Sequence, residues 1–104
     1  GQYKGVPKLD FERLQEIRNR VDVPLVLHGS SGVPDEAIQK AISLGVCKVN
    51  IDTNIREAFV AAARKVMEEN PKEIDPRKML GPAREAATEI IREKIRIFGS
   101  SGKA

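Results

Sequence analysis

Two short stretches of the sequence combine glycines with polar side chains that could do chemistry. Residues 28–32 read His-Gly-Ser-Ser-Gly and hold the only histidine of the chain. An imidazole can bind a metal ion or transfer a proton, and a glycine- and serine-rich turn before a helix suits a phosphate group, which backbone N–H groups can approach closely. Residues 50–53 read Asn-Ile-Asp-Thr and would add free N–H groups at a second helix start. These residue types indicate a site for a phosphorylated ligand beside an imidazole.

Each of these features also has a purely structural interpretation. Glycines and serines are common between a strand and a helix, and a single histidine is often a hydrogen-bonded structural residue. A catalytic zinc needs about three protein ligands, more than this chain offers on one face. Ser30 or Ser31 with His28 would resemble a nucleophile and its base, but the sequence has neither a nucleophile elbow nor an evident partner carboxylate. From the residues alone, ligand binding and a structural role both stay open.

Composition narrows the class of protein. The chain has 104 residues, of which 40% are hydrophobic and 32% charged, and its net charge is +3. The charges of opposite sign are interleaved and aromatic residues are few, which argues against a nucleic-acid surface. No apolar run approaches the roughly 18 residues that span a membrane, and no leader peptide is evident. These features predict a cytoplasmic protein that binds neither nucleic acid nor membrane, with Cys47 as a small buried core residue.

Hydrophobic spacing predicts helices that alternate with strands. Asp10 is expected to cap the first helix, and the strands are apolar at both parities, as in a buried parallel sheet. Asn54 and Glu57 resemble a capping box for the third helix. The expected elements are a helix over 10–22, a strand over 24–28, a helix over 34–45, a strand over 46–52, a helix over 54–70 and a last helix over 82–98.

Alternating strands and helices predict an α/β fold with a parallel sheet. Two strands cannot close a barrel, and a complete (β/α)8 barrel takes roughly 250 residues. We therefore expect residues 1–104 to be the C-terminal portion of a single TIM-barrel domain, with its last two strands, their helices and the C-terminal helices. Strand parity predicts that His28, Asn50 and Asp52 face the barrel interior. Because the Asp52 carboxylate would repel an anion, we expect its side chain to pair with a donor or cap the turn.

Three stretches carry a resemblance to a known family: "GQYKGVPKLDFERL", "PLVLHGSSGVPDEAIQKAISLGVCKVNIDT" and "DPRKMLGPAREAATEIIREKIRIFGSSGKA". Together they resemble the C-terminal part of class II, zinc-dependent fructose-1,6-bisphosphate aldolases. The resemblance implies a (β/α)8 barrel that reversibly cleaves fructose 1,6-bisphosphate to dihydroxyacetone phosphate and glyceraldehyde 3-phosphate in glycolysis and gluconeogenesis. Separately, the last helix has more apolar face than one barrel wall needs, which suggests a homo-oligomer, a dimer or tetramer, with packing over its own barrel as the alternative.

The resemblance also implies roles for individual residues. His28 matches a zinc ligand. Asn50 matches the second substrate-binding segment, and because its amide can donate to the reacting oxygens we expect it to be catalytic. Backbone carbonyls of Gly1 and Gly29 match ligands of a monovalent cation, sodium or potassium. The other zinc histidines and the acid/base aspartate would precede Gly1, so we expect the 104-residue chain alone to be inactive. The residues that match the dihydroxyacetone phosphate site are Gly1, Gly29, Ser30, Ser31, Asn50, Ile51, Asp52 and Thr53.

Two alternatives to this function remain. Tagatose-bisphosphate aldolases share the same core motifs, so the preferred sugar stays open. A non-catalytic barrel subunit that supports a partner aldolase is the second alternative, against which the presence of His28, Asn50 and Asp52 argues.

Overall fold

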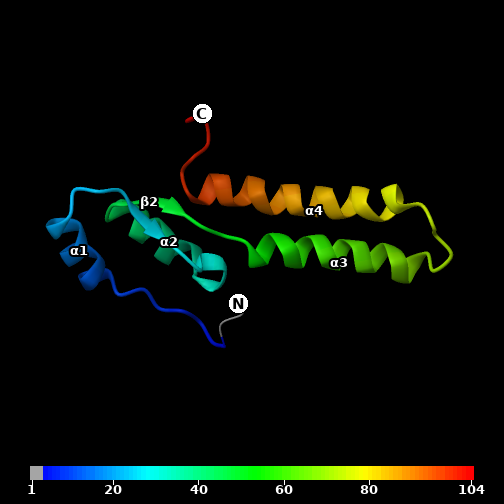
Figure 1. Cartoon of the computed structure of the whole chain (residues 1–104), viewed down its shortest axis with the longest axis horizontal. Helices are drawn as coiled ribbons and strands as arrows, with labels where there is room; N and C mark the ends of the chain where they lie inside the picture. Colours follow the sequence, from blue (N-terminus) through cyan, green and yellow to red (C-terminus); the bar gives the residue numbers. More distant parts are fainter. Residues whose placement is uncertain (1–3) are drawn as a thin grey trace.

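The computed structural model describes residues 4–104 as four α-helices, two short strands and one turn of 3₁₀ helix. Figure 1 shows the strands with α1 and α2 at one end of an elongated molecule and α3 and α4 as a hairpin at the other. The overall dimensions are 59 × 34 × 20 Å. The elements are α1 (Phe11–Arg20), β1 (Leu25–Leu27), η1 (Ser30–Gly32), α2 (Asp35–Ser43), β2 (Val46–Val49), α3 (Thr53–Glu69) and α4 (Pro76–Ile97).

The two strands pair in parallel, with α2 as the crossover between them. Val26 lies opposite Lys48, as strand parity predicts. The register shifts between Leu25 and Val26, so Cys47 has no residue opposite it on β1. Cys47 is exposed, and the prediction that it is a core residue is wrong. Val46, the residue before Cys47, is the buried residue of β2.

The first two helices begin where the sequence predicts. The Asp10 carboxylate caps α1 by accepting a hydrogen bond from the Arg13 N–H at 3.0 Å. The amphipathic α2 buries Ile38 and Ala41 completely. The small apolar core of the described residues consists of Val33, Ile38, Ala41, Val46 and Ala83.

The third helix begins earlier than predicted. The Asp52 carbonyl accepts hydrogen bonds from the N–H groups of Ile55 and Arg56, so α3 starts at Thr53. Asn54 lies inside the first turn and not in the capping position. The predicted capping box of Asn54 and Glu57 is therefore wrong, because helical bonding has already begun at Asp52.

The last helix also begins earlier than predicted. Asp75 caps α4 by accepting from the Arg77 N–H, and Pro76 occupies the first position, which needs no N–H donor. The Arg77 guanidinium holds the pKa of the Asp75 carboxyl below its usual range. Pro82, the predicted start, lies inside α4. The helix continues past this proline and packs along α3.

The end of α4 is fastened to the start of α2. Lys94 forms an ion pair with Asp35 at 3.1 Å, and its side chain is only 16% exposed. The Gln39 amide also donates to the Ile97 carbonyl. These contacts hold the α3–α4 hairpin against the layer that carries the strands.

Many apolar side chains stay exposed within residues 4–104. Val26 on the strands is 43% exposed, and Val60, Met67, Ile74, Leu80, Ile91 and Ile95 are exposed on the hairpin and its loop. Among the described residues, no helix combines the length and apolar composition needed to cross a bilayer. The exposed apolar surface is large for a core of five buried apolar residues.

Candidate phosphate pocket and metal ligand

The segments after β1 and β2 lie side by side and are joined by hydrogen bonds. The Asn50 N–H donates to the Leu27 carbonyl at 2.9 Å, which continues the parallel pairing past the end of β2. The Ser30 hydroxyl donates to the Asn50 carbonyl at 2.8 Å, and Ser30 is only 2% exposed. The side chain of Ser30 therefore connects the two segments and leaves any ligand contact to its backbone.

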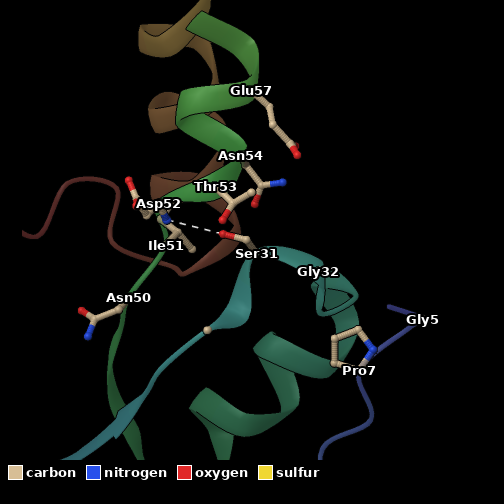
Figure 2. A pocket seen from close by; sticks show the side chains of 11 residues that line it. Gly5, Pro7, Ser31, Gly32, Asn50, Ile51, Asp52, Thr53, Asn54 and Glu57 are labelled. Atoms are coloured by element: carbon tan, nitrogen blue, oxygen red, sulfur yellow. Dashed lines mark hydrogen bonds between the residues drawn. The ribbon is translucent and has the colours of Figure 1, made fainter. Parts of the chain in front are cut away.

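A sharp turn directs the first segment from β1 into α2. Gly29 has φ +66°, in the left-handed region that favours glycine, although no atom would contact an added Cβ. The Val33 N–H then donates to the Ser30 carbonyl at 3.1 Å and closes the 3₁₀ turn. The turn places Ser31 and Gly32 opposite the start of α3 (Figure 2).

A hollow of about 480 Å³ lies between the two segments. Figure 2 shows Ser31 and Thr53 on facing sides of it, and the Asp52 N–H donates to Ser31 Oγ at 3.4 Å. Of the predicted ligand residues, Ser30 is buried behind the hollow, and Gly1 lies outside the described residues. The lining residues are Gly5, Pro7, Gly29, Ser31, Gly32, Asn50, Ile51, Asp52, Thr53, Asn54 and Glu57.

The electrostatics of this hollow suit an anion. The N-terminus of α3 opens onto it, and the first N–H groups of a 17-residue helix have no carbonyl partners within that helix. The Asp52 carboxylate accepts from the Arg56 guanidinium at 2.8 Å, which offsets its negative charge. The expectation that Asp52 pairs with a donor is thus confirmed.

His28 lies next to the hollow but does not line it. Its exposed ring contacts Asn50, with 3.0 Å between His28 Nδ1 and Asn50 Nδ2. Within residues 4–104, no three His, Cys, Asp or Glu side chains gather as a metal site would require. An exposed imidazole at the end of β1 fits one zinc ligand, and the other ligands would have to come from elsewhere.

Comparison with known proteins identifies the family. A family model described as fructose-bisphosphate aldolase class-II matches residues 1–103. The chain belongs to the class II fructose-bisphosphate aldolase family. This membership confirms the resemblance read from the glycine-rich and Asn-Ile-Asp-Thr segments.

Individual aldolases are similar to the chain over nearly all of its length. A fructose-bisphosphate aldolase of Geobacillus stearothermophilus is 49% identical over 104 residues, which are the whole chain and 36% of that protein. The crystal structure of the YdjI aldolase from Escherichia coli K12 has a TM-score of 0.80 at 43% identity, over 94% of this chain and 36% of that one. A fructose-bisphosphate aldolase structure from Campylobacter jejuni has a TM-score of 0.73 at 23% identity, over 88% of this chain and 35% of that one, and supports the fold alone. The chain thus spans about a third of the length of these aldolases.

Two residues that line the hollow, Asn54 and Glu57, were not predicted from the sequence as site residues. Asn54 lines the hollow, and its Oδ1 atom is buried without a hydrogen-bond partner among the described residues. Because their spacing was interpreted as a capping box, Asn54 and Glu57 were not considered as residues that line the pocket. The ion pair of Asp52 with Arg56 could have been predicted from the sequence, because residues four apart on a helix are neighbours.

The Ser30–Asn50 hydrogen bond predicts different effects for two neighbouring serines. Ser30→Ala leaves a backbone carbonyl unpaired, so it should lower the free energy of unfolding by about 1–3 kcal/mol. Ser31→Ala is the matched control and should change it by less than about 0.5 kcal/mol, because its hydroxyl accepts only one long bond. Urea unfolding of both variants in the intact protein measures the difference. Equal losses would show that the Ser30 bond does not hold the two segments together.

Proposed function

We propose that the intact protein reversibly cleaves fructose 1,6-bisphosphate to dihydroxyacetone phosphate and glyceraldehyde 3-phosphate. The observation that carries this proposal is the hollow at the N-terminus of α3, with Asn50 between it and His28. Asn50 lines the hollow and also contacts His28, so a phosphorylated ketone bound in the hollow would lie beside the proposed metal ligand. Membership of the class II aldolase family supports the same reaction.

The phosphate of dihydroxyacetone phosphate is proposed to bind in the hollow. Ser31 and Thr53 supply hydroxyl donors, and Gly29, Ser30, Ile51 and Asp52 contribute backbone groups of the two segments. The dipole of α3 favours the negative charge there. Holding the phosphate fixes the reacting carbons relative to His28 and so contributes to the rate by positioning.

His28 is proposed to hold zinc together with ligands from outside the described residues. When bound, zinc would act as a Lewis acid for the electron pair that C3–C4 cleavage leaves on the substrate. Asn50 is the proposed catalytic residue of this chain. Its amide N–H groups would donate to the reacting oxygens as negative charge develops on them.

The 104 residues are proposed to form the C-terminal portion of a TIM barrel. Val26 and Lys48 are exposed on one face of the strands, where the N-terminal remainder of a barrel would cover them. The chain matches only 36% of the length of the Geobacillus aldolase, which supports the proposal that it is one portion of a larger barrel. A homo-oligomer, a monovalent cation at Gly1 and Gly29, and a cytoplasmic location stay predictions.

The zinc role of His28 predicts a loss of both metal and activity. His28→Ala in the intact protein should abolish cleavage and weaken zinc binding by at least tenfold, because one of about three ligands is removed. Zinc content by metal analysis and turnover of fructose 1,6-bisphosphate, with tagatose 1,6-bisphosphate in parallel, are the measurements. Full activity with normal zinc content would overturn the assignment, and faster cleavage of the tagatose sugar would change the substrate only.

The phosphate role of Thr53 predicts an effect on substrate binding. Thr53→Ala should raise the KM for the bisphosphate by roughly tenfold with little change in kcat, because it removes a charge-assisted hydrogen bond of about 1.5 kcal/mol. Thr88→Ala is the matched control, since the Thr88 hydroxyl bonds the Arg84 carbonyl on α4, away from the hollow. Steady-state kinetics compare the two. An unchanged KM in Thr53→Ala would remove Thr53 from the phosphate site.

A further inference from the structure

The two sides of the hollow belong to differently packed parts of the chain. Ser31 and Gly32 line it just before α2 begins. Asp52 and Thr53 line it where α3 begins. Because α3 packs along α4, Figure 1 shows the last turns of α4 beside the first turns of α3. The width of the hollow therefore depends on how α2 and α4 are held relative to each other.

An ion pair joins the start of α2 to the last turn of α4. Lys94 Nζ lies 3.1 Å from Asp35 Oδ1, although the two residues are 59 positions apart in the chain. The Lys94 side chain is only 16% exposed, so solvent screens this pair less than the exposed pairs along single helices. A second contact between the two helices, from Gln39 Nε2 to the Ile97 carbonyl, is exposed and 3.4 Å long. The ion pair is therefore the stronger of these two connections.

The ion pair lies behind the hollow and not in it. Asp35 is the first residue of α2 and follows Gly32 by three positions. Lys94 is in the last turn of α4, beside the start of α3. Neither side chain lines the hollow. Lys94 can therefore act on a bound ligand only by placing the segments that do.

The two helices do not need the pair in order to form. An acidic side chain in the first turn of α2 and a basic one in the last turn of α4 each interact favourably with their own helix dipole. Both interactions persist when the partner is removed. Loss of the pair should therefore release α4 from α2 and leave both helices in place.

The part of the site that would do the chemistry is held by other bonds. The Asn50 N–H donates to the Leu27 carbonyl at 2.9 Å, and the Ser30 hydroxyl donates to the Asn50 carbonyl at 2.8 Å. These bonds join the segments after the strands and do not involve α4. Loss of the ion pair should therefore move the start of α3 more than it moves Asn50 or His28.

We infer that the Lys94–Asp35 ion pair holds the start of α3 at the distance from Ser31 that a phosphate group needs. Lys94 is then a positioning residue for substrate binding. This inference rests on the proposed function, in which the hollow binds the phosphate of dihydroxyacetone phosphate. Without the pair, phosphate binding has to bring the two sides of the hollow together, and the free energy that this takes weakens the binding.

The inference predicts an effect of Lys94 on KM and not on kcat. Lys94→Met in the intact protein should raise the KM for fructose 1,6-bisphosphate about fivefold with little change in kcat, the lower end of the coupling between separate sites. Inhibition by inorganic phosphate should weaken by the same factor. Methionine keeps a long unbranched side chain and removes the charge. Steady-state kinetics with and without inorganic phosphate measure both effects.

Two further variants serve as rescue and control. Lys94→Arg should largely restore the KM, because a guanidinium can also pair with the Asp35 carboxylate. Lys65→Met removes the same charge from an exposed pair with Glu69 at the far end of α3 and should leave the KM unchanged. A raised KM in Lys65→Met equal to that in Lys94→Met would show an effect of net charge alone and would overturn the inference.

Variants of Asp35 separate the connection from its charges. Asp35→Ala, changed on the more exposed side of the pair, should also raise the KM, and it gives the test if Lys94→Met does not fold. The double variant of Asp35→Ala with Lys94→Met should have the KM of Lys94→Met alone, because the connection is already lost. An unchanged KM in Asp35→Ala would overturn the inference. A double variant with a restored KM would show that the unpaired carboxylate repels the phosphate, and would overturn it as well.

Thr53→Ala separates this inference from the proposed function. An unchanged KM in Lys94→Met beside a raised KM in Thr53→Ala would overturn the inference and leave the phosphate site in place. An unchanged KM in both variants would contradict the phosphate site itself. A lower kcat in Lys94→Met at unchanged KM would place the effect at the reacting groups and would also overturn the inference.

Discussion

The hydrogen bond from the Ser30 hydroxyl to the Asn50 carbonyl is the contact on which the rest of the site depends. It joins the segments that follow two parallel strands with a length of 2.8 Å, and the Ser30 end of it is buried. Because of it, the turn at Gly29 and the start of α3 face each other across one hollow. It also fixes the backbone of Asn50 at the point where the side chain reaches His28. A hydroxyl that the sequence offers as a ligand donor acts instead as the connection between the two halves of the site.

Local patterns predicted the elements that have clear signals. The cap at Asp10, the parallel pair of strands and the apolar face of α2 with Ile38 and Ala41 follow from spacing alone. The exposure of Cys47 could not be predicted, because an apolar strand pattern does not show which face of the strand the neighbouring elements cover. Pro82 was mistaken for a helix start because proline is common there, while Asp75 and Pro76 provide an equally good start earlier.

The sequence placed His28, Ser31, Asn50 and Thr53 after two adjacent parallel strands, and the structure pairs these strands. The roles of these residues in a site stay predictions. The pairing of Asp52 with Arg56 resolves the difficulty of a carboxylate beside an anion. The separate roles of Ser30 and Ser31 could not be predicted, since adjacent identical side chains differ only in which way the turn directs them.

We propose above that the catalytic groups are divided between these 104 residues and a part of the barrel that precedes them. The most direct measurement is turnover of fructose 1,6-bisphosphate by the 104-residue chain alone and by the same chain joined to the upstream part of its own polypeptide, each with zinc and with EDTA. The account predicts no turnover by the chain alone, whose described residues offer one metal ligand, and EDTA-sensitive turnover by the joined protein. Zinc-dependent turnover by the 104 residues alone would contradict it.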